Sequence, residues 1–501
     1  MTGAGASPEH NSFGHAVKWS LVMNIGNQLT GTIVLLVIAA LLGPKAFGTV
    51  ALATVFLLFV QLFLEQGLTT TIIQRKTLTD RHLDAAFWAI LATAAMLFFG
   101  TILLAGWWAE VNHARDLAGV LRVMSPIIFI QALTVVQQAL LQRSLSFKAL
   151  AIRANSASVI GGAVGIIAAF AGAGVWALVL QQLATQVIAL VLLWAVSGWR
   201  PGLRFSRAAV VDLYGFSRSV FLGKAGTFVQ SQLDSIIIGV SFGPVAVGLY
   251  RMALRIARTI VDAFSQPVAL AALPAFSRLQ DDQAKLDWTF RDSVGRSAGL
   301  VIPLAAGAAA VSDLFFRLLG EEWSGAAAVL VVFAVLAAAR SVNNLCGPLL
   351  QATGRPGVAA AMTWSLAAVN VVVFLLVASL VGDRGAPAQA FAMAVGRTAP
   401  FTLIYLPITL ALAMRMAGSS FRGILVAVRP ALLSVPAIVV GARGAVALFD
   451  PYLDDFWMLL VAIAVGGLAG GFVLVTMSPF WRGALAKALR LLRRNPPRAG
   501  T

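Results

Sequence analysis

Residues 31–64 read GTIVLLVIAALLGPKAFGTVALATVFLLFVQLFL, two apolar runs separated by a Gly-Pro-Lys turn. With its flanking residues, each run supplies the roughly 20 apolar residues that cross a ~30 Å hydrocarbon core. Glycine ends a helix, and proline cannot continue one but suits the first turn of the next. The stretch therefore predicts two transmembrane helices joined by a tight turn.

The same alternation of apolar runs and short polar turns continues along all 501 residues. The chain is 59% hydrophobic and 11% charged, whereas an ordinary soluble domain has about 25% charged residues. This composition excludes a soluble enzyme, a nucleic-acid-binding module and a disulfide scaffold. We expect an all-α polytopic membrane protein with about fourteen transmembrane helices. The expected spans are 17–42, 47–72, 85–108, 119–141, 154–171, 174–197, 214–242, 248–273, 293–311, 326–350, 358–380, 388–413, 425–448 and 456–478.

The distribution of charge predicts the orientation. If the amino terminus is cytoplasmic, the cytoplasmic connections and the carboxyl tail together hold 22 Lys and Arg residues, and the opposite connections hold four, with nine acids. Lys and Arg collect in short cytoplasmic loops of membrane proteins. We therefore expect both termini in the cytoplasm. This also accounts for the net charge of +17 without nucleic acid as a partner.

An internal repeat appears at an offset of 200 residues. The turn GPKAFG at 43–48 recurs as GPVAVG at 243–248. Six spans separate the copies, an even number, so both halves insert with the same orientation, as in a parallel repeat. Two similar turns arising by coincidence are the alternative. The expected parts are a tail (1–16), a first lobe (17–197), a linker (198–213), a second lobe (214–413), two extra helices (425–478) and a basic cytoplasmic tail (479–501).

Charged residues within the spans are the candidate substrate-binding groups. Each costs about 2.5–3.5 kcal/mol at membrane depth, so it faces the bundle interior or a cavity. Arg251, Arg255, Arg258 and Asp262 follow the spacing i, i+4, i+7, i+11, which is one stripe of a helix. Arginine side chains near the middle of the membrane suit an anionic substrate, phosphate in particular, because the planar guanidinium presents paired N–H donors. The candidate cations are Lys224, Arg251, Arg255, Arg258, Arg340 and Arg397.

Structural roles are the alternative for these residues. Arg251 lies near a helix end, where snorkelling explains it equally well. Arg258 and Asp262 have the spacing of an i,i+4 ion pair. Asp234, Asp262 and Glu65 are candidate coupling or salt-bridge acids, and Asp234 lies at the same expected depth as Arg255.

Polar groups of the first span are candidate sugar contacts. Asn24 and Gln28 can hydrogen-bond sugar hydroxyls, although such residues also join helices within membranes. The single cysteine is Cys346, and all four histidines lie in the amino-terminal tail or in loops. We therefore expect no metal site and no cofactor.

Two further patterns concern helix shape and the carboxyl tail. Prolines at 126, 267, 303, 348, 400 and 407 fall inside expected spans, where proline kinks a helix. The tail from 481 to 498 carries six Lys and Arg residues and no acid. Such a segment lies along an anionic leaflet or serves as a solvated end that fixes orientation.

Four segments carry a resemblance to a known family: LGPKAFGTV at 42–50, EQGLTTTIIQ at 65–74, LGEEW at 319–323 and LQATGR at 350–355. Together with the repeat, they resemble the Wzx-type polysaccharide transporters. These are the lipid-linked oligosaccharide flippases of the multidrug/oligosaccharidyl-lipid/polysaccharide superfamily. The resemblance covers about residues 14–480, nearly the whole chain.

The resemblance implies two six-helix lobes in a V around a central cationic cavity, followed by two further helices. It implies a non-enzymatic flippase of the bacterial inner membrane that moves an undecaprenyl-diphosphate-linked oligosaccharide outward by alternating access. The implied partners are this lipid-linked oligosaccharide, membrane lipids and the polysaccharide polymerase or export machinery.

The chain departs from related proteins at two places. Many flippases carry charges where this chain has Asn24 and Gln28, and drug antiporters use amino-terminal acids, of which only Glu65 is present. The first departure leaves the substrate open, and the second disfavours a drug exporter. A drug or metabolite exporter remains one alternative. A membrane-embedded polymerase or glycosyltransferase is the other, although the short outer connections disfavour it.

Overall fold

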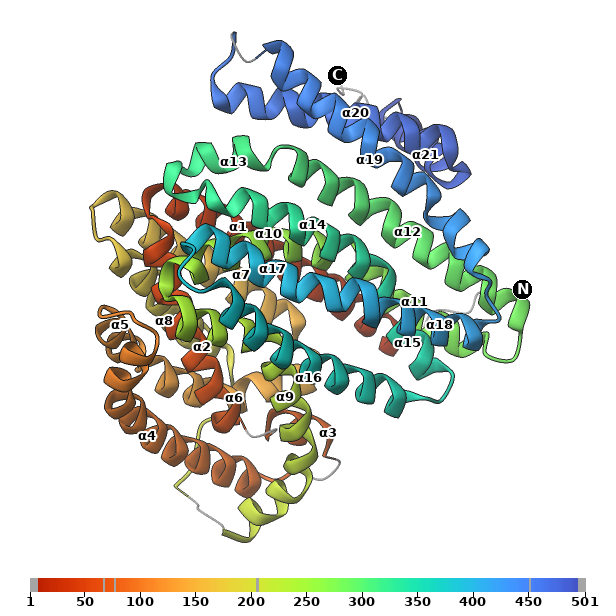
Figure 1. Ribbon diagram of the computed structural model, residues 1–501. Helices are drawn as coiled ribbons and strands as arrows, with labels where there is room; N and C mark the ends of the chain where they lie inside the picture. Colours follow the sequence, from red (N-terminus) through yellow and green to blue (C-terminus); the bar gives the residue numbers. More distant parts are fainter. Residues whose placement is uncertain (1–7, 66–67, 76–77, 204–206, 450–451, 494–501) are drawn as a thin grey trace, which may run out of the picture. The chain divides into compact units, whose positions relative to one another are not determined.

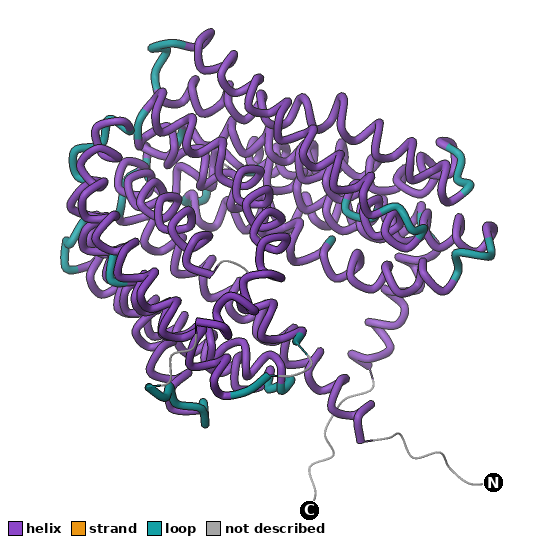
Figure 2. The backbone as a smooth tube through the Cα atoms, turned by 90° about the horizontal axis from the view of Figure 1, so that it is seen from below, coloured by secondary structure: helices purple, strands orange, loops and turns teal. Residues whose placement is uncertain are grey.

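The computed structural model describes residues 8–65, 68–75, 78–203, 207–449 and 452–493. Throughout these ranges the regular structure is helical, without strands (Figures 1 and 2). The first helices are α1 (Pro8–Leu41), α2 (Pro44–Glu65), α3 (Leu68–Gln74), α4 (Asp80–Val111), α5 (Leu117–Met124), α6 (Ile127–Arg143), α7 (Phe147–Phe170), α8 (Val175–Val196), α9 (Arg207–Phe242) and α10 (Pro244–Phe264). The remainder are α11 (Gln266–Arg278), α12 (Gln283–Ala310), α13 (Ser312–Leu319), the 3-10 turn η1 (Glu321–Trp323), α14 (Gly325–Asn343), α15 (Cys346–Ala352), α16 (Pro356–Val381), α17 (Ala386–Pro400), the π-helix η2 (Phe401–Tyr405), α18 (Leu406–Ala417), α19 (Phe421–Phe449), α20 (Asp455–Met477) and α21 (Pro479–Arg493).

Within the described ranges, 12 helices are long and apolar enough to cross a membrane. The all-α polytopic fold is therefore confirmed. The first and seventh expected spans correspond to α1 and α9, which are not among these 12. A count of fourteen spans stays a prediction.

Several spans are broken at the expected prolines. Pro126 separates α5 from α6, and Pro267 follows the break between α10 and α11. The last broken span passes through the π-helix η2 between Pro400 and Pro407. Proline removes a helical donor and its ring clashes with the preceding turn. Helix interruptions thus coincide with these prolines, whereas Pro303 lies inside the continuous helix α12.

Polar side chains form hydrogen bonds between two helix breaks, the one between α10 and α11 and the one between α14 and α15. Ser265, between α10 and α11, shares a hydrogen bond of 2.9 Å with Ser297 of α12. Asn344, between α14 and α15, donates to Ser265 over 3.1 Å. In a membrane, the polar groups released by a helix break must find partners inside the protein. The breaks are thus built into the packing of α12.

The chain divides into two compact units. The first comprises 1–251 with 378–389, and the second comprises 252–377 with 390–501. In the first unit α1 packs on α7, α7 on α8, and α9 on α2 and α4. In the second, α12 packs on α14 and α19, and α19 on α20. These units follow packing, whereas the expected lobes follow the sequence repeat; the lobe boundaries stay a prediction.

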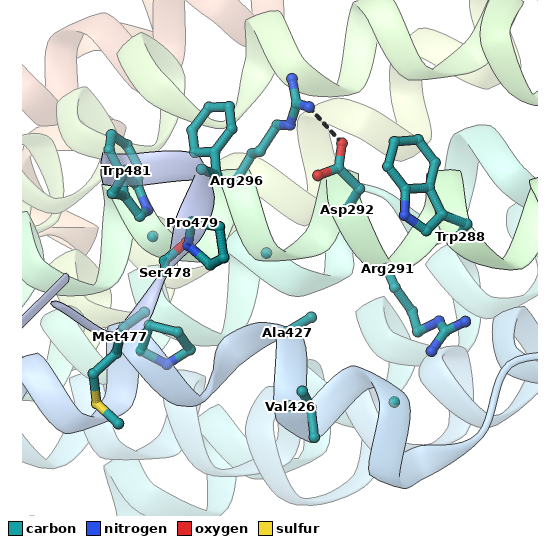
Figure 3. A pocket seen from close by; sticks show the side chains of 16 residues that line it. Trp288, Arg291, Asp292, Arg296, Val426, Ala427, Met477, Ser478, Pro479 and Trp481 are labelled. Atoms are coloured by element: carbon teal, nitrogen blue, oxygen red, sulfur yellow. Dashed lines mark ion pairs between the residues drawn. The ribbon is translucent and has the colours of Figure 1, made fainter. Parts of the chain in front are cut away.

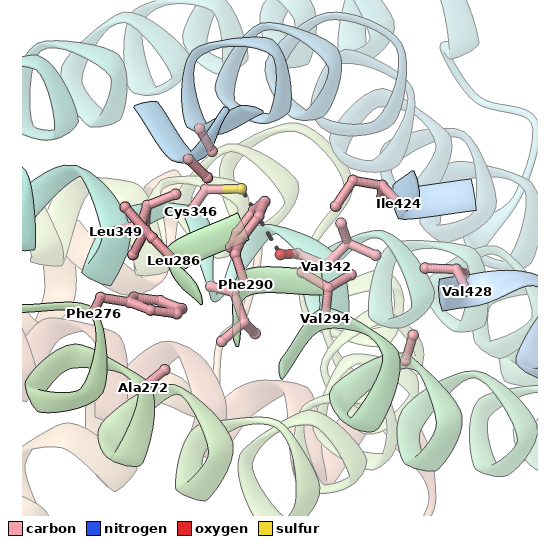
Figure 4. Close-up of a cluster of buried hydrophobic side chains, with 14 of the residues drawn as sticks. Ala272, Phe276, Leu286, Phe290, Val294, Val342, Cys346, Leu349, Ile424 and Val428 are labelled. Carbon is pink, nitrogen blue, oxygen red and sulfur yellow. Dashed lines mark hydrogen bonds between the residues drawn. The ribbon is translucent and has the colours of Figure 1, made fainter. Parts of the chain in front are cut away.

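The second unit is held by an apolar cluster around α12 (Figure 4). Phe276 of α11 and Phe290 of α12 are fully buried, with ring centroids 6.1 Å apart in an edge-to-face arrangement. Cys346, at the start of α15, lies in the same cluster and donates to the carbonyl oxygen of Val342 over 3.9 Å. The cysteine is therefore a packing residue.

The two copies of the repeated turn pack against each other inside the first unit. A Cβ atom on Gly48 would lie 1.7 Å from the carbonyl oxygen of Pro244, and one on Gly248 would lie 2.0 Å from that of Pro44. Each turn thus places its glycine against the proline carbonyl of the other turn. This reciprocal contact fits a parallel repeat, which stays a prediction. It also admits only glycine.

We predict that Gly48→Ala and Gly248→Ala each destabilise the protein, because the methyl group meets backbone that cannot move aside. Overpacking of this kind costs about 1–3 kcal/mol. The midpoint of thermal unfolding in detergent measures the effect. Gly100→Ala and Gly106→Ala of α4 are matched controls, since nothing lies within 4 Å of their Cβ positions. Equal midpoints for Gly48→Ala and Gly100→Ala would contradict the prediction.

Candidate functional site

In the second unit, three arginines gather around one acid. The charges of Arg258, Arg340 and Arg255 all act on the carboxylate of Asp262. Arg255, Arg258 and Asp262 come from the predicted stripe of α10, and Arg340 comes from α14. Arg258 and Arg340 are half-buried, and the other two side chains are exposed. We call these four residues the cationic cluster.

Aromatic side chains of the π-helix extend the cationic cluster. The guanidinium of Arg340 lies over the ring of Phe401, 5.6 Å from its centroid. The rings of Phe401 and Tyr405 are 5.3 Å apart, and Tyr405 shares a hydrogen bond with Thr363. A π-helix changes the angular position of residues that follow it, and such segments occur often at functional sites. Sequence reasoning missed both rings, although Pro400 and Pro407 marked the irregular segment.

Arg397 differs from the other candidate cations. It lies in α17, one turn before η2, and only 5% of its surface is exposed. A buried charge must be compensated by close partners. Arg397 is therefore part of the packed interior of its unit, whereas Arg258 and Arg340 are partly accessible.

The first unit brings together a candidate cation and a candidate acid. Lys224 of α9 forms an ion pair with Glu65, the last residue of α2. Gln61 donates to the same carboxylate over 3.1 Å. The side chains of Lys224 and Glu65 are 37% and 25% exposed. The sequence predicted Lys224 as a substrate-binding cation and Glu65 as a coupling or salt-bridge acid, without pairing the two.

Aromatic contacts continue this junction along α2 and α9. The ring centroids of Phe59 and Phe228 are 5.7 Å apart, and those of Phe63 and Phe221 are 5.6 Å apart. Aromatic pairs at such distances add about 0.5–1.5 kcal/mol beyond their buried area. The ion pair thus lies at the end of a packed seam between the two helices.

Asp234 is buried in a hydrogen-bond network of the first unit. It accepts hydrogen bonds from the Tyr250 hydroxyl at 2.8 Å and from the backbone and hydroxyl of Ser235. Arg251 donates to Gln232 at 2.9 Å and to the Ser235 hydroxyl at 3.2 Å. Asp234 is 1% exposed and Tyr250 is fully buried. The network ties the start of α10 to α9, which favours the structural interpretation of Asp234 and Arg251.

The candidate sugar contacts lie in α1. Gln28 is half-buried, and its backbone carbonyl accepts a hydrogen bond from Thr32 at 2.8 Å. The side chain of Asn24 lies outside the described residues. Across the described ranges, no three His, Cys, Asp or Glu side chains are grouped so as to hold a metal ion.

Residues 37–328 match the family described as polysaccharide biosynthesis protein. The chain belongs to this family. The predicted resemblance to polysaccharide transporters is thereby confirmed, and so is the multi-pass membrane character that accompanies it.

Similar polysaccharide biosynthesis proteins include named transport components. The succinoglycan biosynthesis transport protein ExoT of Rhizobium meliloti is 26% identical over 349 residues, 70% of each chain. The lipopolysaccharide biosynthesis protein WzxC of Escherichia coli is 24% identical over 432 residues, 84% of this chain and 85% of WzxC. Among solved structures, the lipid II flippase MurJ in an inward closed conformation matches 94% of this chain and 100% of MurJ, with a TM-score of 0.72. At 13% identity, that likeness concerns the fold.

We predict that the Lys224–Glu65 pair contributes about 1 kcal/mol of coupling between α2 and α9, because both side chains are partly shielded from water. Lys224→Glu and Glu65→Lys should each lower the unfolding midpoint through repulsion of like charges. The double swap should recover most of the loss. A double-mutant cycle on thermal unfolding measures the coupling. A double swap as unstable as the sum of the two single variants would contradict this prediction.

Proposed function

We propose that this polysaccharide biosynthesis protein is a flippase for an undecaprenyl-diphosphate-linked oligosaccharide. It moves the lipid-linked sugar from the inner to the outer leaflet of a bacterial cytoplasmic membrane by alternating access. Both chain termini are cytoplasmic, and no bond of the substrate is broken. Membership of the family, the flippase-like fold and the positive-inside charge distribution support this proposal.

The observation that carries the proposal is the cationic cluster itself. The charges of three arginines act on the carboxylate of Asp262, on helices that are apolar enough to span a membrane. Cationic side chains at membrane depth suit an anionic substrate, and a diphosphate diester carries about two negative charges. Each guanidinium presents a planar fork that matches phosphate oxygens in pairs. The guanidinium of Arg340 also lies over the ring of Phe401, 5.6 Å from its centroid.

Other charges of the chain take supporting roles in this proposal. The Lys224–Glu65 pair closes the seam between α2 and α9, and the network around Asp234 fixes the start of α10. Arg397 belongs to the packed interior of the span that contains the π-helix. Gln28 remains the candidate sugar contact in α1, with Asn24 one turn before it.

Arg258→Ala should lower flipping of a fluorescent polyprenyl-diphosphate oligosaccharide in proteoliposomes. A charge-assisted hydrogen bond is worth about 1.5–3 kcal/mol, which is about a 10- to 100-fold loss. Arg258→Lys should recover part of the rate, because it restores the charge without the fork. Arg122→Ala is the matched control, since Arg122 is exposed and lies in α5. Wild-type flipping by Arg258→Ala would remove the cluster from the substrate path.

We also predict that membrane potential alone drives flipping. Each charge moved through 100 mV is worth about 2.3 kcal/mol, and the bound anion roughly cancels the cluster. The potential then acts mainly on the return of the empty, positive carrier toward the negative cell interior. A valinomycin potential, without a pH or sodium gradient, should therefore raise the rate.

The alternative for energetics is proton or sodium antiport through Glu65, Asp262 or Asp234. Flipping that ignores the potential, responds to a pH gradient and disappears in Glu65→Gln or Asp262→Asn would establish it. Asp234→Asn should lower protein stability instead, because it weakens the network with Tyr250 and Ser235.

A further inference from the structure

A second polar site lies in the second unit, away from the cationic cluster. A cavity of about 500 Å³ opens between α12, α19 and the start of α21 (Figure 3). Trp288 and Trp481 line opposite sides of it, with Asp292 and Arg296 of α12 between them and Arg291 below Trp288 in this view. The site shares no residue with the cationic cluster. We call it the headgroup cavity.

The arginines of the headgroup cavity are held in place with donors to spare. Arg296 pairs with Asp292 at 2.7 Å, and its guanidinium lies over the Phe480 ring, 4.5 Å from the centroid. Arg291 pairs with Asp287 on the same helix. A guanidinium has five N–H donors, so one carboxylate partner leaves several for a second anion. The side chain of Arg296 is 44% exposed, so these donors can be reached.

Further cations lie on α19 and α21, two of the helices whose residues line the cavity. These exposed side chains are Arg422, Arg429, Arg482 and Lys487. Arg482 directly follows Trp481, a residue of the cavity wall. Helix α21 alternates apolar residues with Arg and Lys, as helices that lie in the plane of an anionic membrane surface do.

An apolar cavity of about 600 Å³ adjoins the headgroup cavity. It lies among α12, α19 and α20, and its walls include Leu300, Pro303, Ile438 and Leu459. Gly299 and Trp481 line both cavities, so they mark the junction. A Cβ atom on Gly299 would lie 2.8 Å from the indole nitrogen of Trp481. A basic opening followed by an apolar chamber has the polarity of a charged lipid.

The apolar cavity also lies on a different face of α10 from the substrate charges. Ile256 and Phe264 contribute to its wall. At 100° per residue they fall on the side of α10 opposite to Arg255, Arg258 and Asp262. The lipid-shaped site is thus separate from the path proposed for the transported diphosphate.

We propose that the headgroup cavity binds the phosphodiester headgroup of an anionic membrane phospholipid, with one acyl chain in the apolar cavity beyond Trp481. The lipid fastens α21 and α19 to α12. A phosphodiester carries a single negative charge, which suits arginines that already share their charge with Asp287 and Asp292. This inference does not depend on the proposed transport activity.

Photolabelling of the full-length protein in nanodiscs tests the proposal. Phosphatidylglycerol and phosphatidylcholine probes carry the same photoreactive acyl chain, and mass spectrometry locates the adducts. Labelling of 300–308 and 459–474 should favour phosphatidylglycerol by about fivefold for each contributing arginine. Equal labelling by both probes would show that the surface contacts any lipid without regard to headgroup charge, and it would overturn the proposal. Displacement by a polyprenyl diphosphate, but not by unlabelled phosphatidylglycerol, would assign the site to substrate and overturn it as well.

Three variants separate the headgroup from the chain. The double variant Arg296→Gln/Asp292→Asn keeps the net charge and should abolish the preference for phosphatidylglycerol. The matched control Arg317→Gln/Asp455→Asn removes a different ion pair of the same unit, 3.7 Å long, and should keep the preference. Gly299→Leu should fill the junction and abolish acyl-chain labelling. An unchanged preference in the Arg296 variant, with a folded protein, would overturn the proposal whether or not Gly299→Leu folds.

Discussion

The compensation of charge inside a low-dielectric membrane is the constraint on which this structure depends. Each charge placed at membrane depth carries a cost that only a partner can offset. In the first unit, Lys224 pairs with Glu65, and Asp234 accepts several hydrogen bonds. In the second unit, the charges of three arginines act on the carboxylate of Asp262. This gathering of cations is the feature on which the proposed binding site rests.

The internal repeat explains why the chemistry is concentrated in one half. The turns at 43–48 and 243–248 form the same backbone contact from both sides, so α2 and α10 begin from equivalent positions. Yet α10 carries Arg251, Arg255, Arg258 and Asp262. The residues 200 positions earlier, on α2, are Ala51, Val55, Leu58 and Leu62. The charged stripe is therefore found on the second copy of the turn and helix, whereas the charges of α2 are Lys45 and Glu65 at its two ends.

Sequence patterns predicted the features that depend on one helix at a time. Apolar runs marked the spans, prolines marked most of the breaks, and the i, i+4 spacing placed Arg258 beside Asp262. Such patterns give the depth of a residue and its face on its own helix. They do not give the direction in which that face is turned within the bundle. Several acids and cations share similar depths, so the depths alone could not select Glu65 for Lys224.

The same limitation explains the two interpretations that the structure redirected. Asp234 was expected at the depth of Arg255, but Ser235 and Tyr250 donate to it, and Tyr250 carries no sequence signal that separates it from an ordinary buried aromatic residue. Arg340 was expected as one of the candidate substrate-binding cations, and the structure adds an aromatic partner, because its guanidinium lies over the ring of Phe401 in the π-helix. The π-helix lies between Pro400 and Pro407. Its formation depends on tertiary packing, which the spacing of the two prolines does not encode.

The positive charge of the cationic cluster also gives the proposed transport cycle its direction. A ligand shifts a conformational equilibrium only by the difference between its affinities for the two states. An anion that neutralises the cationic cluster gains most in the state where the arginines are most shielded from water, because electrostatic attraction grows as the local dielectric falls. Substrate binding therefore favours a closed state that the empty, positively charged cluster disfavours. In this proposal, the arginines that would bind the diphosphate also oppose closure of the empty protein, so closure and substrate loading are linked by one electrostatic interaction.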